Sequence, residues 1–175
     1  MRESRYSSYS PATTFHSDYS KTNFFCHVEN SNEDPLPKPL SLYTHLPFCD
    51  TLCYYCGCHK FISPKTSTLI SYLASIKDGI KIQEKHFNKD RHAQQVHLGG
   101  GTPSYLRIEQ IQTLTETIKD HFVFTNNDDF ELAIEIDPRT TSNADITSLA
   151  GIGFNRMSFG IQDFDESVQK AINRV

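Results

Sequence analysis

Four cysteines lie close together in the sequence and are its strongest candidates for chemistry. Cys49, Cys53 and Cys56 follow the spacing C-x3-C-x2-C, and Cys58 comes two residues later. This spacing lets one loop place three thiolates on three corners of a cubane iron–sulfur cluster, which leaves the fourth iron open to bind another molecule. The alternative is a tetrahedral zinc site with Cys58 or His59 as the fourth ligand. Because no second C-x2-C pair exists, the spacing favours the iron–sulfur cluster.

Other segments could complete such a site. Residues 99–103 are Gly-Gly-Gly-Thr-Pro and lack the lysine of a phosphate-binding loop, so a nucleoside triphosphate is a poor candidate ligand. The glycines either form a strand edge that hydrogen-bonds an amino acid or make a tight turn. Glu135 is either a solvated carboxylate or a ligand of ribose hydroxyls. His45 is a candidate catalytic residue, although a packed histidine is commoner, and Cys26 stands apart from the cluster of cysteines.

The composition narrows the class of protein. The chain has 175 residues, of which 37% are hydrophobic and 22% charged, and a net charge of -4 without a basic cluster. These values fit one soluble globular domain and argue against nucleic acid or a membrane as partner. No apolar run is long enough to span a bilayer, and the N-terminus lacks the apolar stretch of a signal peptide. We therefore expect a cytosolic protein, in which crowded cysteines favour metal over disulfides.

Hydrophobic periodicity predicts strands and helices in alternation after an irregular segment at residues 1–38. That segment is rich in Ser, Thr, Asn and Pro, although we expect some of its aromatic residues to dock on the body. Strict alternation implies a parallel sheet with right-handed crossovers, so the fold class is α/β, with residues 39–175 as the core domain. The strands are expected at 40–46, 95–98, 132–136 and 154–161, and the helices at 67–87, 108–118 and 142–150.

The candidate residues fall at one end of this expected sheet. The cysteine loop follows the first strand, the glycine run follows the second, Glu135 lies near the end of the third, and Gln162 follows the fourth. In parallel α/β sheets, ligands and catalytic groups gather at the carboxyl ends of the strands. This coincidence is the strongest indication within the sequence of an active site.

Taken together, the motifs resemble the radical SAM superfamily and, more narrowly, the oxygen-independent coproporphyrinogen III oxidases. An early segment, Arg5-Tyr6-Ser7-Ser8-Tyr9, is similar to that family's lead-in, with Ser10 where proline is usual, so the resemblance covers nearly the whole chain. The other matching segments are Tyr43-x-His45-x-Pro47-Phe48-Cys49-x3-Cys53-x-Tyr55-Cys56-x-Cys58, the glycine run, Glu135-Ile136-Asp137-Pro138, Gly153-Phe154-Asn155-Arg156, Gly160-Ile161-Gln162-Asp163-Phe164 and Asn173-Arg174.

The resemblance implies a partial (β/α) barrel with a [4Fe–4S] cluster on Cys49, Cys53 and Cys56 and S-adenosylmethionine (SAM) on the open iron. A 5′-deoxyadenosyl radical would drive the oxidative decarboxylation of coproporphyrinogen III to protoporphyrinogen IX in haem biosynthesis. This oxidoreductase reaction needs a low-potential electron donor, and we expect a monomer. By position, the residues that would bind SAM are Tyr43, Tyr55, Gly100, Gly101, Thr102, Glu135, Gln162 and Arg174.

Two other functions stay open. The related haem chaperones share the cysteine and glycine motifs but commonly have Phe at the position of Cys58, which favours the oxidase. A non-catalytic zinc-binding module is the alternative from a different class. The oxidases have longer chains, so we interpret this one as an N-terminal part with about four β/α units. We expect its unclosed sheet to be poorly stable, and the fragment need not be active alone.

Overall fold

The structure is a computed structural model that describes residues 16–126 and 128–175. The chain separates into two compact units, residues 1–37 and 38–175. The lead-in motif at residues 5–9 and the aromatic side chain of Phe15 lie outside the described residues. The candidate site belongs entirely to the second unit.

The first unit contains a helix where the sequence predicts only irregular structure, so that prediction is wrong. Helix α1 (Lys21–Asn32) begins at Ser20, whose hydroxyl accepts a hydrogen bond from the backbone N–H of Asn23. The Asn23 side chain accepts one from the backbone N–H of Ser20 in return, which completes a capping box. Only Val28 of this helix is buried. Because the helix lacks an apolar stripe, hydrophobic periodicity could not detect it.

The second unit is built on one parallel sheet, which confirms the predicted fold class. Each neighbouring pair of strands is parallel, and each strand follows the previous one in space as it does along the chain. The strands lie in the order β1 (Leu40–Leu46), β4 (Ala93–Gly100), β5 (Glu131–Ile136) and β6 (Arg156–Phe159).

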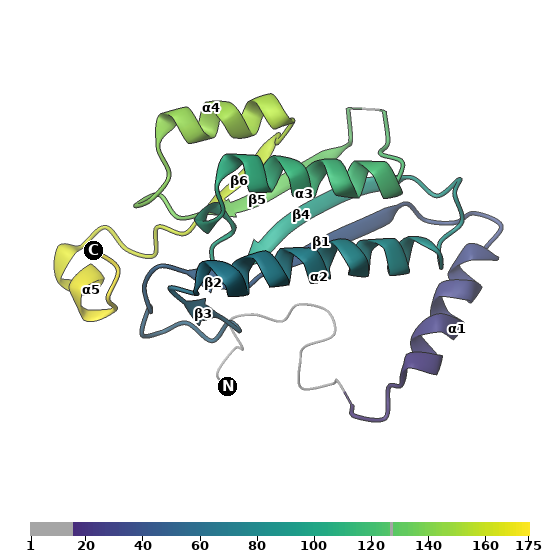
Figure 1. The fold of residues 1–175 in the computed structure, drawn as a ribbon, viewed down its shortest axis with the longest axis horizontal. Helices are drawn as coiled ribbons and strands as arrows, with labels where there is room; N and C mark the ends of the chain where they lie inside the picture. Colours follow the sequence, from purple (N-terminus) through teal and green to yellow (C-terminus); the bar gives the residue numbers. More distant parts are fainter. Residues whose placement is uncertain (1–15, 127) are drawn as a thin grey trace, which may run out of the picture. The chain divides into compact units, whose positions relative to one another are not determined.

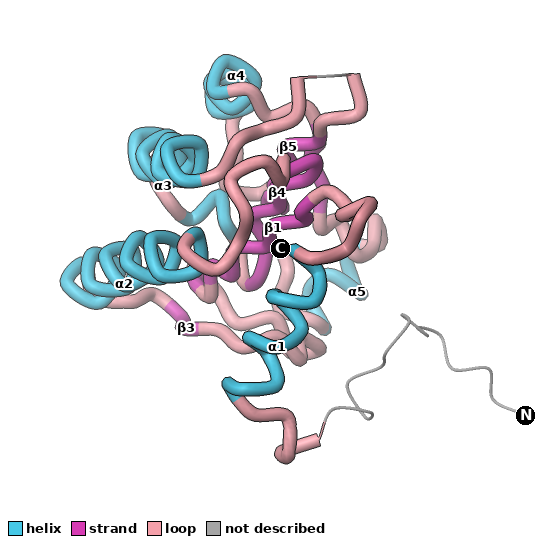
Figure 2. Tube along the Cα trace, turned by 90° about the vertical axis from the view of Figure 1, so that its right-hand side faces the viewer, coloured by secondary structure: helices cyan, strands magenta, loops and turns pink. Residues whose placement is uncertain are grey.

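Three helices connect these strands and cover one face of the sheet (Figures 1 and 2). The core lies between the two layers, because the apolar stripes of the helices pack on the apolar side chains of the sheet. Ile111 and Leu114 of the second of these helices are almost completely buried against strand residues such as Val96 and Ile134. The helices are α2 (Thr66–Glu84), α3 (Ile108–His121) and α4 (Asn143–Ile152).

The predicted boundaries hold for strand β1 and differ elsewhere. Strand β4 is longer than expected because it continues into the first two glycines of the glycine run. Strand β6 is shorter than expected and ends at Phe159. After it the backbone turns, with the N–H of Ile161 bonded to the carbonyl of Phe159, and Gln162 adopts a positive φ of 71°. This turn leads the chain back across the end of the sheet.

Some short elements were missed because they are too short to show a hydrophobic period. They lie at the end of the sheet where the motifs gather, and they position the candidate site. The short elements are β2 (Phe48–Cys49), β3 (Phe61–Ile62), the 3-10 helix η2 (Pro103–Tyr105) and α5 (Glu166–Ala171).

None of the helices in the described residues combines the length and apolar character that a bilayer span requires.

Candidate cofactor site

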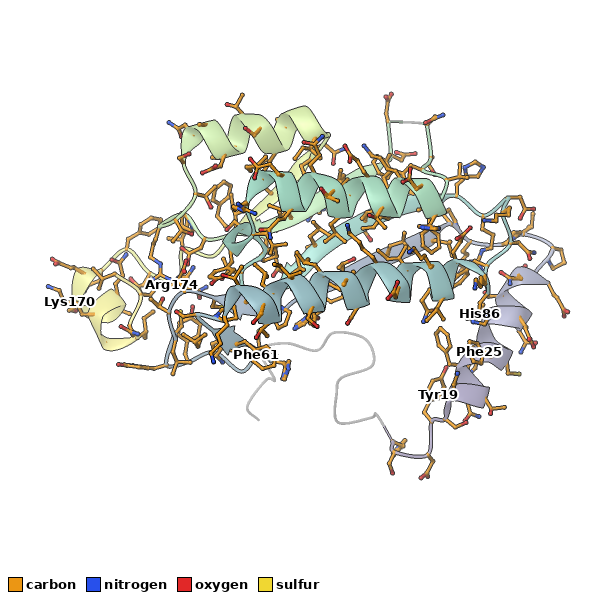
Figure 3. The ribbon with its side chains drawn as sticks, in the orientation of Figure 1. Tyr19, Phe25, Phe61, His86, Lys170 and Arg174 are labelled. Atoms are coloured by element: carbon orange, nitrogen blue, oxygen red, sulfur yellow. The ribbon has the colours of Figure 1, made fainter. Side chains whose placement is uncertain are left out.

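The cysteine loop is closed at its base by a small parallel sheet. Strand β2 begins immediately after Pro47, and β3, which includes Phe61, pairs with it. The N–H of Phe61, which is labelled in Figure 3, donates to the carbonyl of Pro47 at 2.6 Å, and the N–H of Ser63 donates to the carbonyl of Cys49 at 2.8 Å. The Phe48 ring packs edge-on against Tyr72 of α2 at 5.1 Å. Residues 50–60 therefore form a loop with fixed ends beside the sheet.

This loop and the carboxyl ends of the strands enclose a cavity of about 510 Å³. The cavity brings together side chains that lie far apart in the chain, such as Cys53 and Arg174, which are 121 residues apart. The predicted site residues that line it are Cys49, Cys53, Tyr55, Cys56, Gly100, Gly101, Thr102, Glu135, Gln162 and Arg174.

Each of the three candidate ligand sulfurs lies beside a different hydrogen-bond donor. The hydroxyl of Thr102 donates to Cys49 Sγ at 3.5 Å, and Arg174 Nη1 donates to Cys53 Sγ at 3.3 Å. Cys56 accepts from Cys58, a neighbour in its own loop. Thr102 follows β4 and Arg174 follows α5, so the three donors come from separate segments of the chain.

The same contacts set the acidity of two of these thiols in opposite directions. Burial raises the pKa of Cys49, and the hydrogen bond from Thr102 only partly offsets this effect. Burial also opposes ionisation of Cys56, but hydrogen bonds from Cys58 and the charge of Lys60 outweigh it and lower its pKa. Lys60 Nζ in addition donates to the carbonyls of Cys56 and Cys58, at 2.7 and 3.2 Å. The thiol of Cys58 therefore acts as a donor to a candidate ligand.

The glycine run makes room for side chains of the protein itself. A Cβ on Gly99 would lie 2.8 Å from the Tyr43 ring, and one on Gly101 would lie 2.9 Å from Cys49 Sγ. A Cβ on Gly100 would lie 2.9 Å from the His45 ring, and the φ of Gly100 is +126°. The sequence interpretation, a glycine edge for a ligand or a tight turn, missed this packing. Because these glycines have no Cβ, the side chains around the cavity can approach the backbone of strand β4 closely.

Glu135 lies at the cavity with its carboxylate oriented by two groups from strand β4. One oxygen accepts from the backbone N–H of Gly100 at 3.1 Å, and the other lies 3.2 Å from His97 Nε2. Its side chain is 42% exposed, so the carboxylate keeps open acceptor positions that a ligand hydroxyl could use. Glu135 lines the cavity, and its role as a ligand of ribose hydroxyls stays a prediction.

Tyr43 and His45 lie beside the cavity but do not line it. Their side chains share a contact of 3.1 Å between Tyr43 Oη and His45 Nδ1, and His45 Nε2 lies 3.2 Å from the carbonyl of His59. The Tyr43 ring also stacks on His97, with 5.7 Å between ring centres. Both residues therefore support strand β4 and the cysteine loop from the sheet face.

Sequence reasoning missed a buried ionic network at the cavity. Asp137 follows strand β5 and is 5% exposed, and its carboxylate pairs with Arg139 at 2.7 Å and with Arg174 at 3.5 Å. Burial would raise the pKa of Asp137, but hydrogen bonds from Arg139 and the charges of Arg174 and Arg139 outweigh it and hold the pKa below its usual range. The only sequence signal was the position of Asp137 at the end of a strand, which does not reveal its partners.

The donor set around the cavity fits an iron–sulfur cluster bound through three thiolates. Four thiols line the cavity, of which Cys58 donates to Cys56, and the cations Lys60, Arg139 and Arg174 line it too, where they can balance the charge of thiolates. The five cysteines carry no disulfide. In the described parts of the chain, no three His, Cys, Asp or Glu side chains are arranged to hold a single metal ion. The residues that would hold a cluster are Cys49, Cys53 and Cys56.

Comparison with known protein families identifies the class. The family model described as the radical SAM superfamily matches residues 43–175, which contain the sheet, the cysteine loop and the cavity. The chain therefore belongs to the radical SAM superfamily. This membership implies a [4Fe–4S] cluster and SAM as cofactors of the class, and it favours the radical SAM interpretation over a zinc-binding module.

The individual relatives are similar over almost all of this chain. Oxygen-independent coproporphyrinogen III oxidase from Synechocystis sp. is 40% identical over 98% of the chain, and the enzyme of that name from Salmonella typhimurium is 41% identical over 97%. The solved structure of coproporphyrinogen III oxidase from Escherichia coli, described as a radical SAM enzyme, is 39% identical and matches 98% of this chain with a TM-score of 0.84. The chain spans 36% of the length of these two sequence relatives and 38% of the solved chain.

Proposed function

We propose that this chain is the part of an oxygen-independent coproporphyrinogen III oxidase that binds the [4Fe–4S] cluster and SAM. The observation that carries the proposal is the cavity at the carboxyl ends of the strands, where three cysteines meet Glu135 and Arg174. Similarity to enzymes of that name over 97–98% of the chain supports it. When bound, the cluster would supply an electron and SAM would supply the radical that removes a hydrogen atom from a substrate propionate.

In this proposal the residues of the chain bind and orient the cofactors. Cys49, Cys53 and Cys56 would hold three irons and leave the fourth to SAM. The open oxygen positions of Glu135 would accept hydrogen bonds from ribose hydroxyls, because Gly100 and His97 already fix the orientation of its carboxylate. Closed ends hold the cysteine loop over the cavity and limit the access of water to the reaction.

The other predicted SAM-binding residues contribute in different ways. Tyr55, Gly101, Thr102, Gln162 and Arg174 line the cavity and could contact SAM directly. Arg174 would also balance negative charge at the cluster. Tyr43 and its neighbour His45 would act from the edge of the cavity by supporting the glycine run.

The substrate, the electron donor and the cellular location are further parts of the proposal. Coproporphyrinogen III would be the substrate, and a low-potential electron carrier would be the electron donor. The protein would be a monomer in the cytosol. Two alternatives differ in a measurable ligand, since a haem chaperone would bind haem and a zinc module would bind zinc. Cys58 favours the oxidase over the haem chaperone, because that branch commonly has Phe at this position.

Anaerobic reconstitution with iron and sulfide, run beside zinc loading, tests the proposal. We expect about four iron and four sulfide per chain and a brown protein that retains SAM on gel filtration. Coproporphyrin III, added as a stable probe, should quench protein fluorescence at lower concentration than haem does. One zinc per chain without bound SAM would contradict the radical SAM function, and tighter binding of haem would favour the chaperone.

A further inference from the structure

Asp137 is the most buried charged side chain that lines the cavity, and both of its carboxylate oxygens are occupied. Oδ1 accepts from the backbone N–H and from Nε of Arg139, each at 3.0 Å. Oδ2 accepts from Arg139 Nη2 at 2.7 Å and lies 3.5 Å from Arg174 Nη2. One carboxylate therefore joins two guanidinium groups.

Both arginines extend from this carboxylate to the cysteine loop. Arg139 Nη2 donates to the hydroxyl of Thr51 at 3.3 Å, and Arg174 Nη1 donates to Cys53 Sγ at 3.3 Å. The side chain of Arg174 is 10% exposed, and it is further held by donation to the carbonyl of Gly160. Asp137 thus links the end of strand β5 to two points of the loop, through charge-assisted hydrogen bonds from Arg139 and an ion pair with Arg174.

We propose that Asp137 is a positioning residue that holds Arg174 in the orientation in which it donates to Cys53 Sγ. The proposal rests on the proposed function, in which Cys53 is a cluster ligand. A buried guanidinium that loses its carboxylate is left uncompensated and moves toward other partners or water. Hydrogen bonds to ligand sulfurs raise the reduction potential of an iron–sulfur cluster. Asp137 therefore sets the reduction potential through Arg174.

The direction of a potential shift distinguishes this role from a simple effect of charge. The Asp137→Asn change removes a negative charge near the cluster, which by Coulomb's law alone raises the potential. Loss of the hydrogen bond from Arg174 to Cys53 lowers it instead. We expect the second effect to dominate, so that Asp137→Asn and Arg174→Gln both lower the potential.

The experiment is a redox titration of the reconstituted chain and five variants. We expect Asp137→Asn and Arg174→Gln to lower the midpoint potential, and the double variant to shift it no further than Arg174→Gln alone. Glu131→Gln is the matched control, because Glu131 lies at the opposite end of strand β5 and pairs with Arg156 at 2.6 Å. Glu131→Gln should leave the midpoint potential unchanged. Arg174→Lys keeps the charge, so its midpoint potential should lie between those of Arg174→Gln and the wild type.

Several results would overturn the proposal. A raised or unchanged potential in Asp137→Asn would do so, as would additive shifts in the double variant. If the wild-type chain takes up no cluster, the proposed function fails, and the same double-mutant cycle is then measured on urea unfolding of the cluster-free chain. There the loss in the double variant must be smaller than the sum of the two single losses. Additive losses would contradict the link between Asp137 and Arg174, even if the Asp137→Asn variant is itself strongly destabilised.

Discussion

At the scale of single residues, the three candidate ligand thiols are not equivalent. Cys56 has a lowered pKa because Cys58 and Lys60 stabilise its thiolate, whereas burial raises the pKa of Cys49. Since the thiolate is the form that binds metal, Cys56 is better prepared than Cys49 to bind iron. In this arrangement Cys58 donates a hydrogen bond to Cys56, which gives the fourth cysteine of the motif a role that does not require it to be a ligand.

Serine substitutions at Cys56 and Cys58 test this difference. We expect Cys56→Ser to lose most of the bound iron and sulfide after reconstitution, because it removes a ligand. Cys58→Ser should retain the cluster, since a hydroxyl can still donate to Cys56. Iron and sulfide per chain and the visible absorption measure both. Equal losses in the two variants would identify Cys58 as a ligand and contradict the assignment.

Gly101 is predicted to be essential for the position of Cys49. A methyl group on Gly101 would lie 2.9 Å from Cys49 Sγ and 3.0 Å from the backbone of Phe48, so one of them must move. We expect Gly101→Ala to cost about 1–3 kcal/mol in unfolding free energy, and to reduce cluster loading. Gly57→Ala in the same loop is the control, because nothing lies within 4 Å of its added Cβ. Full cluster loading in Gly101→Ala would refute this account of the glycine run.

At the scale of elements, the sequence predicted what depends on periodic apolar residues. Helix α3 buries residues at helical spacing and was found from this pattern, and strand β1 was found as a short apolar run. The pairing of β2 with β3 could not be found, because two-residue strands have no period. The network around Asp137 could not be predicted for another reason, because it joins segments that only the tertiary fold brings together. Helix α1 is held by its capping box, a local signal that periodicity does not register.

Helix α4 lies within two residues of its expected bounds, and its start can be tested. The Ser142 hydroxyl accepts from the backbone N–H of Asp145 at 3.2 Å, and Gly153 ends the helix with a φ of +112°. We expect Ser142→Ala to lower the free energy of unfolding by about 1 kcal/mol. Ser148→Ala is the control, because the exposed Ser148 hydroxyl donates only to a carbonyl within the same helix. Equal effects in urea unfolding would mean that the cap does not stabilise α4.

At the scale of the whole molecule, the sheet has an edge at β6. Within the described residues β6 pairs with β5 alone, and Phe159 is 48% exposed. Further along, Phe164 is 87% exposed. Unpaired edges and exposed apolar side chains favour association with another strand or surface. The expectation that the chain alone is poorly stable remains a prediction.

The stability of the cluster-free chain should depend on Asp137 at low pH. The folded state lowers the pKa of Asp137 below its ordinary value of 3.8, so its contribution is complete above that value and is lost as the pH falls through the folded pKa. Asp137→Asn carries no titrating proton. We therefore expect the unfolding free energy of wild type to fall more steeply below about pH 4 than that of the variant. Parallel curves in urea unfolding across this range would show that Asp137 does not contribute.

The central claim is that three cysteines bind a cluster whose fourth iron is open to SAM. Electron paramagnetic resonance of the reconstituted, dithionite-reduced chain tests it directly, because the spectrum reports both the cluster and a change of ligand at its iron. The account predicts a [4Fe–4S] signal that changes shape when SAM is added and is absent in Cys56→Ser. A cluster signal that SAM leaves unchanged, or no cluster signal in the wild-type chain, would contradict it.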